Sequence, residues 1–379
     1  MPAKRLRTCL LLLTASVLLG GCTAVEVRRL AGDNTTGRNN NTAGSTIARQ
    51  YLLEQLEPIA DPIGGSYEQA ITSGTNVLGL IPGTDLADEY VIVGAHYDHV
   101  GSSCTSKEAG DSICNGATDN ATGVAAALAI ARDIARNPTR RSVVVAFWDR
   151  EEDGLVGSRH YTQNPLVPLA DTVAYVNFDI QGANLLPALR GNTFAVGSET
   201  GGTGFQDLVR SAAAPQTLDT TLFSAIFGQG RSDYANFINV DVPTVFFTDS
   251  TGPCYHTNQD EVGIVDFAKL DEQIATSLAV TRELGETSDP PTWTEGLPAV
   301  TFDDLVGFAD VVNLAYTDVE RFSEADQQTI TEIRDEVNAL VAEGREAFDS
   351  SDVSTLIGDA VTAVNLLTRG ACDGFLAPG

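Results

Sequence analysis

Basic residues are scarce in this chain of 379 residues, where 23 Lys and Arg stand against 51 Asp and Glu and give a formal net charge of −28 at pH 7. The only lysines are Lys4, Lys107 and Lys269. Binding the phosphate backbone of nucleic acid requires clustered cationic side chains. We therefore expect no nucleic-acid partner for this protein.

Long apolar runs are missing after the first 21 residues, so no later segment is predicted to span a bilayer. At the N-terminus, Lys4, Arg5 and Arg7 precede a short apolar stretch that ends in Leu-Gly-Gly-Cys22, a pattern typical of a secretory signal. This ending resembles the bacterial lipoprotein signal, in which the cysteine is acylated and becomes the mature N-terminus. We expect residues 1–21 to be a signal peptide. The resemblance implies an exported lipoprotein held by its lipid at the outer membrane, on the periplasmic or cell-surface face.

Cysteine is limited to six residues. Removal of the signal and acylation of Cys22 leave four that can pair in three ways in an oxidising compartment, namely Cys104, Cys114, Cys254 and Cys372. We expect a Cys104–Cys114 disulfide because the intervening loop is short and polar, and its closure contributes roughly 2–3 kcal/mol. A Cys254–Cys372 pair would follow by elimination, and this second pairing stays open.

The rest of the chain divides by composition. Residues 22–45 are rich in Gly, Asn and Thr and predict a tether and N-terminal loop. Strand-like and helix-like segments alternate over residues 46–288, which predicts a three-layer α/β domain with a mostly parallel central sheet. A Pro/Gly/Thr linker then leads into residues 299–379, where the patterns predict a helical extension packed on the first domain, without an active site of its own.

The segment "WDREEDG" (148–154) places two adjacent glutamates at the end of a short apolar strand. Neighbouring side chains on a strand point to opposite faces, so Glu151 and Glu152 are predicted to serve different partners. Two buried carboxylates without a cation are costly. A solvated acidic turn is the alternative that the rest of the chain must exclude.

Other polar residues also follow predicted strands, and ligands in α/β folds gather at the carboxyl ends of strands. Taken singly, Asp119 is explained as a helix cap, Asp179 as a strand-end turn and His256 as a structural loop residue. Together with the glutamate pair and His96 they supply two imidazoles and four carboxylates. This set suits two divalent metal ions with mixed nitrogen and oxygen ligands, Zn²⁺ first.

Six sequence blocks carry a family resemblance: His-x-Asp, Asp-Asn-x-[ST]-Gly, Glu-Glu-x-Gly-Leu-x-Gly-Ser-Arg-His-Tyr, Asn-x-Asp, Ser-Asp-[HY] and Tyr-His-Thr-x-x-Asp. Their order over about residues 26–285 resembles the M28 family of zinc aminopeptidases. The resemblance implies two zinc ions per chain bridged by Asp119. Glu152 and His256 would complete one metal site, and His96 and Asp179 the other.

The resemblance also implies roles around the metals. Glu151 would be the general base and acid acting on a metal-bridging hydroxide, and Tyr255 would donate to the oxyanion. Asp98 would orient His96, Asp233 would stand behind the ligands, and Arg231 would bind substrate. His99 receives no role, and His160 is predicted to be structural. Thr118 is a departure, because many members carry a second aspartate there.

The implied activity is hydrolysis of the first peptide bond of peptides with a free N-terminus. Three alternatives remain open at this point. They are a glutaminyl cyclase of the same fold, a carboxypeptidase or other amidohydrolase, and a binding module that has lost its chemistry.

Overall fold

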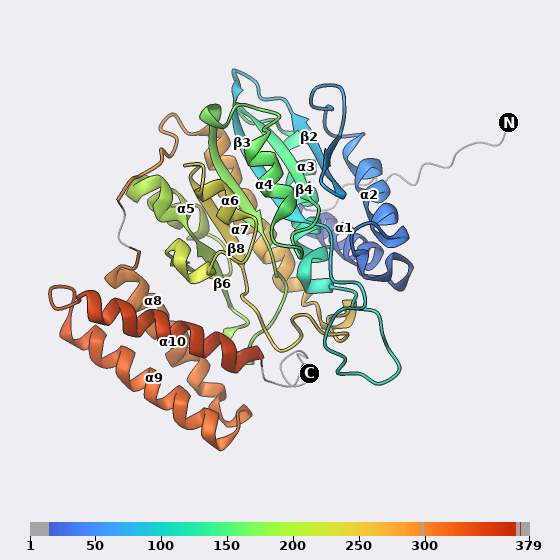
Figure 1. Cartoon of the computed structure of the whole chain (residues 1–379). Coiled ribbons are helices and arrows are strands. Elements are labelled where there is room, and N and C mark those ends of the chain that lie inside the picture. Colours follow the sequence, from blue (N-terminus) through green and yellow to red (C-terminus); the bar gives the residue numbers. More distant parts are fainter. Residues whose placement is uncertain (1–14, 297–298, 369–371, 373–379) are drawn as a thin grey trace.

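The computed structural model describes residues 15–296, 299–368 and 372, and a single eight-stranded sheet forms its centre (Figure 1). The sheet order is β1-β2-β4-β3-β5-β8-β6-β7. In chain order the strands are β1 (Glu68–Ile71), β2 (Gly74–Ile81), β3 (Leu86–His96), β4 (Arg141–Trp148), β5 (Thr172–Phe178), β6 (Asn192–Val196), β7 (Asp219–Phe223) and β8 (Thr244–Thr248). The central strands β4, β3, β5 and β8 run parallel, whereas β1, β2 and β6 each make an antiparallel pair. The predicted mostly parallel sheet is thereby confirmed.

Helices cover both faces of this sheet. One face carries α1 (Ala15–Leu30), α2 (Ala43–Leu56), α3 (Thr122–Arg136), α5 (Gly202–Ala213) and α7 (Phe267–Glu286). The other face carries α4 (Val156–Gln163) and α6 (Tyr234–Ile238), followed by the C-terminal helices. Two apolar layers therefore enclose the strands, which confirms the three-layer α/β architecture.

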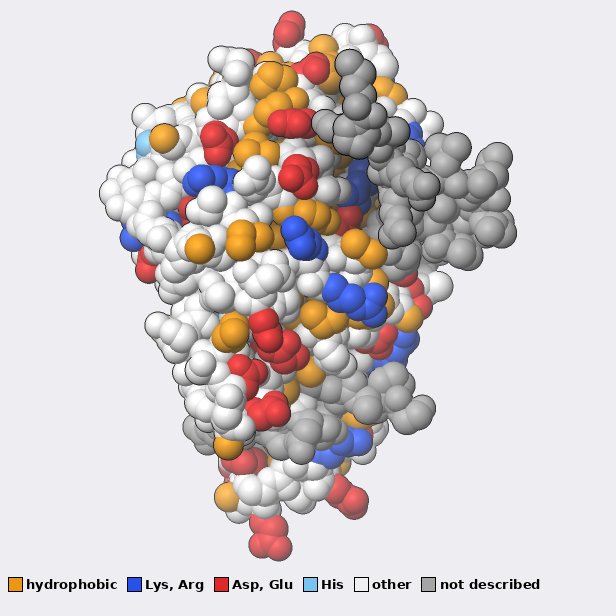
Figure 2. Space-filling model, turned by 90° about the vertical axis from the view of Figure 1, so that its right-hand side faces the viewer, with side chains coloured by type: hydrophobic (Ala, Val, Ile, Leu, Met, Phe, Trp, Pro, Cys, Tyr) orange, Lys and Arg blue, Asp and Glu red, His pale blue; other side chains and the backbone are white. Residues whose placement is uncertain are grey.

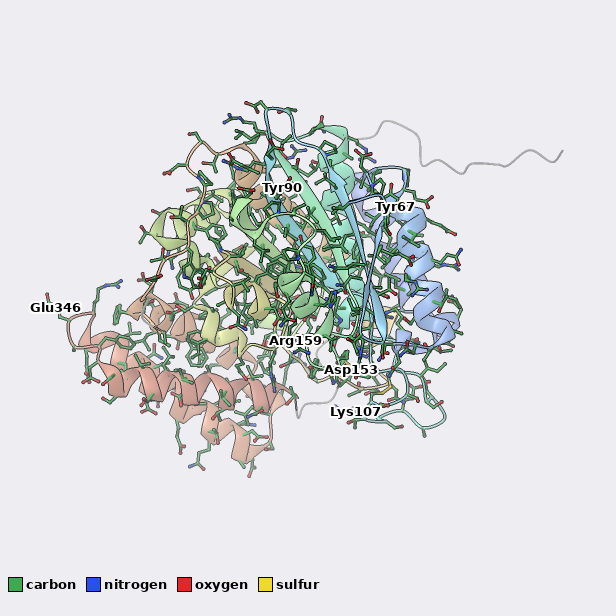
Figure 3. The ribbon with its side chains drawn as sticks, turned by 45° about the horizontal axis from the view of Figure 1, so that its top comes forward. Tyr67, Tyr90, Lys107, Asp153, Arg159 and Glu346 are labelled. Carbon is green, nitrogen blue, oxygen red and sulfur yellow. A yellow bond between two sulfur atoms is a disulfide. The ribbon has the colours of Figure 1, made fainter. Side chains whose placement is uncertain are left out.

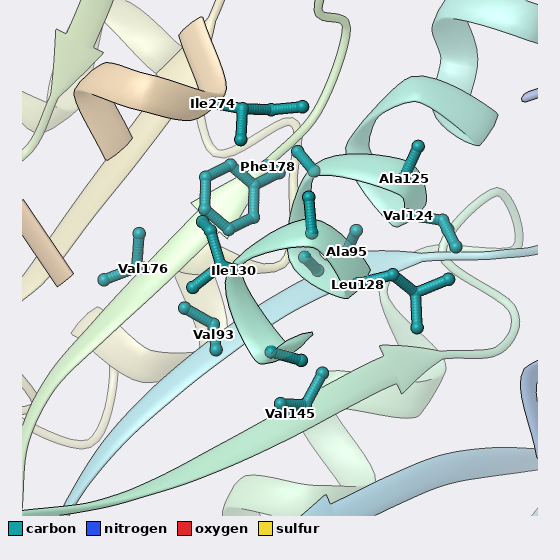
Figure 4. Close-up of a cluster of buried hydrophobic side chains, with 14 of the residues drawn as sticks. Val93, Ala95, Val124, Ala125, Leu128, Ile130, Val145, Val176, Phe178 and Ile274 are labelled. Carbon is teal, nitrogen blue, oxygen red and sulfur yellow. The ribbon is translucent and has the colours of Figure 1, made fainter. Parts of the chain in front are cut away.

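The sequence of β4 explains how a strand is buried on both sides. All eight residues of "RSVVVAFW" are buried, with Val143, Val145 and Phe147 in one apolar layer and Val144, Ala146 and Trp148 in the other. Figure 4 shows Val93, Ala95 and Val145 of the sheet packed against Val124, Leu128 and Ile130 of α3. The alanines of α3 are buried there as well, and their small side chains let the helix lie close to the sheet.

The C-terminal extension consists of α8 (Phe302–Ala315), α9 (Glu324–Glu343) and α10 (Ser350–Thr368), which lie side by side in Figure 1. Its buried Leu305, Phe308 and Val312 belong to the same apolar cluster as Phe194 and Phe223 of the sheet. Asp304 completes a capping box at the start of α8. The predicted helical extension is confirmed, and it shares a core with the catalytic domain.

The expectation of a loose tether over residues 22–45 is wrong. Helix α1 continues to Leu30, and the side chains of Val27 and Leu30 are fully buried against the helical layer formed with α3 and α7. Arg38 is fully buried too, and Thr42 caps α2 by accepting from the backbone N–H of Ser45. The Gly, Asn and Thr content indicated a loop, but the apolar positions between those residues fill the face of the sheet.

Most of the predicted signal peptide lies outside the described residues, which begin at Ala15, and the side chain of Cys22 is not described either. Within the described part of the chain, no helix combines the length and apolar character needed to cross a membrane. On the face shown in Figure 2, Lys and Arg side chains stand among Asp and Glu side chains. The acidic excess therefore does not form one continuous patch on that face.

Two disulfides are present. Cys104–Cys114 closes a loop after β3, as predicted, with 6.2 Å between the Cα atoms. Cys254–Cys372 also forms, with 5.0 Å between the Cα atoms, and answers the pairing that the sequence left open. The second disulfide fixes the end of the extension to the loop that follows β8.

The packing of α1 generates a stability prediction. Replacing the fully buried Leu30 with Ala is expected to lower the free energy of unfolding by roughly 2–5 kcal/mol, because it removes apolar contacts and leaves a cavity. Urea denaturation of the mature chain measures this. Val25→Ala is the matched control on the same helix, since Val25 is 58% exposed and its loss should change stability by at most about 0.5 kcal/mol. Equal stability of both variants and the wild type would show that α1 is a tether after all.

Candidate active site

The predicted site residues gather at one edge of the sheet. Because β3, β4, β5 and β8 are parallel, their carboxyl ends meet there. His96 ends β3 in register with Trp148 of β4, and Asp179 directly follows β5. In Figure 3, Tyr90 near the start of β3 and Asp153 beyond β4 mark opposite ends of the sheet, with Lys107 near the Asp153 end.

Asp119 stands between two groups of ligand-type side chains. Its Oδ1 atom lies 3.3 Å from Nε2 of His96, and its Oδ2 atom lies 3.1 Å from Nε2 of His256. The residue belongs to a single π-helical turn (Ala117–Ala121) directly before α3, and the Asp119–Asn120 peptide bond is cis. One carboxylate thus faces two imidazoles from opposite sides.

The first group contains His96, Glu151 and Asp179, all buried, with one ligand-type atom of each within 4.8 Å of the others. Nε2 of His96 lies 3.4 Å from Oδ1 of Asp179. These three residues come from the ends of β3, β4 and β5, as the strand-end argument predicts.

The second group contains His99, Asp119, Glu152 and His256. Nε2 of His256 lies 2.9 Å from Oε2 of Glu152, and Nδ1 of His99 lies 2.8 Å from Oε1 of the same carboxylate. The two histidines therefore hold both oxygens of Glu152. His99 received no role from the sequence, and its position three residues after His96 was the available signal.

Gly116 makes room for His99. Its φ of +54° lies in the left-handed region, and a Cβ atom there would stand 2.5 Å from the His99 ring. A side chain at this position would displace the ring from Glu152.

Asp98 supports the glutamate pair more directly than it supports His96. Its carboxylate accepts the backbone N–H groups of Glu151 at 3.0 Å and Glu152 at 3.2 Å. The same carboxylate is 3.6 Å from Nδ1 of His96, which is longer than a hydrogen bond, whereas the Asp98 carbonyl oxygen lies 3.2 Å from that nitrogen. Asp98 therefore fixes the turn in which the two glutamates diverge.

Asp260 plays the corresponding part for Asp119, and the sequence prediction missed it. Its Oδ2 atom accepts the Asp119 N–H at 3.0 Å, and its Oδ1 atom accepts the N–H and hydroxyl of Thr118 at 2.9 and 2.8 Å. Thr118, the departure from the family pattern, is thus one of its donors. The signal was the final Asp of the Tyr-His-Thr-x-x-Asp block.

A buried arginine lies behind the site. Arg38 donates to the backbone carbonyls of Leu30, Tyr97, Asn115 and Gly116 at 2.5–2.9 Å. Burial lowers its pKa to about 10, although the nearby carboxylates of Asp119 and Asp260 act in the opposite direction. It remains charged at neutral pH and ties the N-terminal segment to the loops that carry the ligands.

Protons take the place of metal cations in the electrostatics of these residues. Burial alone would lower the pKa of His96 and His256, but the neighbouring carboxylates raise the first well above its usual value and the second to about 10. Burial would raise the pKa of Asp119, but His256 and His96 hold it well below its usual range. The group of residues therefore requires positive charge between its members.

The residues fit zinc. They offer imidazole nitrogens and carboxylate oxygens, the donor types that zinc accepts. Nε2 of His256 is buried between two carboxylates yet makes no hydrogen bond with either, and Nε2 of His99 is also buried without a hydrogen bond. A ligand nitrogen pointing at a cation explains the His256 geometry directly.

The remaining predicted residues occupy different surroundings. Tyr255 stacks on the His256 ring with the centroids 3.9 Å apart, and Arg231 is exposed; both line a cavity of about 320 Å³ that reaches Asp119, Glu151 and Asp179. Asp233 is fully buried, and burial raises its pKa to about 7. His160 lies on α4, away from the ligand groups.

Comparison with known proteins decides the family. The sequence matches the family described as "Peptidase family M28" over residues 76–281, which is more than half of the chain. The chain belongs to this family. M28 membership accounts for the order of the six sequence blocks and for zinc as the metal that the residues fit.

Individual relatives of this M28 member are more distant. It is 30% identical over 247 residues to "Aminopeptidase NAALADL1" of Rattus norvegicus, covering 57% of this chain and 31% of the relative. A solved Zn-dependent exopeptidase from Parabacteroides distasonis shares the fold with a TM-score of 0.58, 20% identity and coverage of 68% and 96%. A glutaminyl cyclase from Bacteroides thetaiotaomicron gives 0.57, 19%, 69% and 97%. The chain thus spans less than a third of the length of that curated relative.

Asp260 generates a prediction about metal affinity. Asp260→Asn should weaken zinc binding about 10–100-fold, because an amide cannot accept all three hydrogen bonds that place Thr118 and Asp119. Competition with a chromophoric chelator measures the affinity. Asp88→Asn removes the same charge at an exposed position and should leave it unchanged. Equal affinities in the two variants would exclude the positioning role of Asp260.

Proposed function

We propose that this protein is an exported di-zinc aminopeptidase that hydrolyses the first peptide bond of substrates with a free N-terminus. The observation that carries the proposal is the geometry of Asp119, whose two oxygens face His96 on one side and His256 on the other. Asp119 would bridge two zinc ions. Glu152 and His256 would hold one ion, and His96 and Asp179 the other.

The residues of the chain divide the chemistry between them. Bound zinc supplies Lewis acidity for the scissile carbonyl and lowers the pKa of a water molecule. Glu151 accepts the proton from the attacking water and returns it to the leaving amine. Burial raises the pKa of the Glu151 carboxyl well above its usual value, which strengthens it as a base.

Tyr255 and Arg231 act on the substrate. Burial raises the pKa of Tyr255, so its hydroxyl keeps its proton at neutral pH and can donate to the developing oxyanion. Arg231 is exposed at the cavity and offers a cation to the peptide beyond the scissile bond.

Two other activities use the same fold. Release of pyroglutamate from Gln-β-naphthylamide would favour a glutaminyl cyclase, and cleavage of peptides only at a free C-terminus would favour a carboxypeptidase. The aminopeptidase is preferred because both ligand groups are complete and because the rat relative is named an aminopeptidase. A binding module without chemistry would have no need for the buried Glu151.

The glutamate pair provides the test of mechanism. Glu151→Gln should retain about two zinc ions per chain and bind leucine p-nitroanilide normally, while kcat falls by about 10²–10⁴-fold, since only the proton shuttle is lost. Glu152→Gln should lose metal first, because a neutral amide replaces an anionic ligand, and excess Zn²⁺ should restore part of its activity.

Atomic absorption for zinc beside kcat for both variants separates the two roles. If both variants keep zinc and activity, the pair is a solvated acidic turn. If the two phenotypes are exchanged, the roles of Glu151 and Glu152 are reversed.

Export as a lipoprotein completes the proposal. The Leu-Gly-Gly-Cys22 ending supports it, and Thr23 is buried with its hydroxyl 3.1 Å from Oδ1 of Asp271 on α7. A lipid on Cys22 would therefore hold the domain against the outer membrane without a spacer.

Removing the acylation site tests the anchor. Cys22→Ser should move the protein from the membrane fraction to the soluble fraction with its specific activity unchanged, because Cys22 takes no part in the ligand groups. Fractionation of cells that produce each form, followed by the anilide assay, provides the measurement. A variant that still sediments with membranes would contradict lipid anchoring.

A further inference from the structure

The cavity beside the metal site is walled on its far side by the C-terminal extension. At one end it is lined by Asp119, Glu151 and Asp179. Away from them it is lined by Phe194 and Phe246 of the sheet and by residues of α8, α9 and α10, such as Phe308, Ile333 and Leu366. The extension lies beyond residues 76–281, the part that matches the family.

We propose that the extension is part of the substrate site and selects peptides with a bulky apolar group next to the scissile bond. This inference rests on the proposed peptidase function. It assigns to α8–α10 a role in specificity that the expectation of a packed appendage did not include.

The sequence of α10 supports this assignment. Its cavity-lining residues include positions 357, 360, 361, 364 and 367, all apolar, and this spacing places them on one face of a helix. Val361 on this face is 37% exposed, and Ile226 across the cavity is 41% exposed. An apolar helix face that lines a void and ends in exposed apolar side chains is suited to receive an apolar ligand through an open mouth.

The size of the cavity sets the size of the group. Its volume of about 320 Å³ is roughly twice that of an apolar cavity of 150 Å³ that binds benzene. The space therefore exceeds what one small side chain such as alanine would fill. Burial of each additional methylene in it should strengthen binding about 4-fold.

Three attachments hold this wall in place. Asp304 of α8 accepts the N–H and hydroxyl of Ser224, just after β7, at 2.7 and 2.8 Å. Asp318 accepts the N–H of Ala188 at 2.7 Å. The Cys254–Cys372 disulfide joins the end of the extension to the residue before Tyr255. The pocket is thus formed before substrate arrives.

Filling the cavity from α10 tests the inference. Ala360→Trp and Ala363→Trp add bulk on the wall without removing a packed side chain. Each should lower kcat/KM for phenylalanine p-nitroanilide about 10–100-fold and that for alanine p-nitroanilide by less than about 3-fold. Zinc content and melting temperature, measured alongside, report on folding. Ala339→Trp on the exposed side of α9 is the control and should leave the phenylalanine-to-alanine ratio unchanged.

A binding measurement separates this inference from the proposed activity. Calorimetry of the zinc-loaded full chain with butyl-, hexyl- and octylamine should show affinity rising with chain length, and Ala360→Trp should end the rise at a shorter chain. If no anilide is cleaved but the alkylamines behave in this way, the peptidase proposal fails and the apolar pocket stands. If anilides are cleaved with the same ratio in wild type, Ala360→Trp and Ala363→Trp, and alkylamine affinity is equally unaffected, the inference is overturned.

Discussion

A high density of buried carboxylates at one sheet edge is the constraint on which the rest of this structure depends. Asp98, Asp119, Glu151, Asp179, Asp233 and Asp260 are all buried there. Uncompensated charges in such a place would cost several kcal/mol each. Arg38 contributes one buried cation, and protons on the histidines or bound metal must contribute the rest. The fold can retain these acids only because cations belong between them.

Backbone amides carry the precision of the site. Asp98 and Asp260 each accept two backbone N–H groups from ligand-bearing turns, so one buried carboxylate fixes the glutamate pair and another fixes Asp119. A carboxylate that accepts such bonds holds the chain more rigidly than side-chain packing alone. Half of the buried charge therefore orients the other half, and the ligand positions follow from main-chain geometry.

The strand-end residues were predictable because parallel strands bring their carboxyl ends together, and a short apolar run followed by an acid or histidine marks each end. Residues acting through distant contacts were not. Asp260 reaches Thr118 across 142 positions, and Arg38 reaches Gly116 across 78. Strand β7, "DTTLF", is only half-buried and half polar, so its pattern did not distinguish it from a loop. Helix α1 was hidden beneath a composition that indicates a tether.

The C-terminal extension shows why a helical pattern alone could not reveal its role. Its periodicity predicts helices with apolar faces, but it does not say which apolar face packs and which lines a cavity. That division depends on Phe194, Phe223 and Phe246, contributed by strands at least 50 residues away in the chain. The Cys254–Cys372 disulfide then joins the extension to the loop bearing His256. Because one loop carries both the metal ligand and the anchor of the cavity wall, displacement of the wall would also disturb the metal site, and the apolar pocket and the charged centre form one mechanical unit.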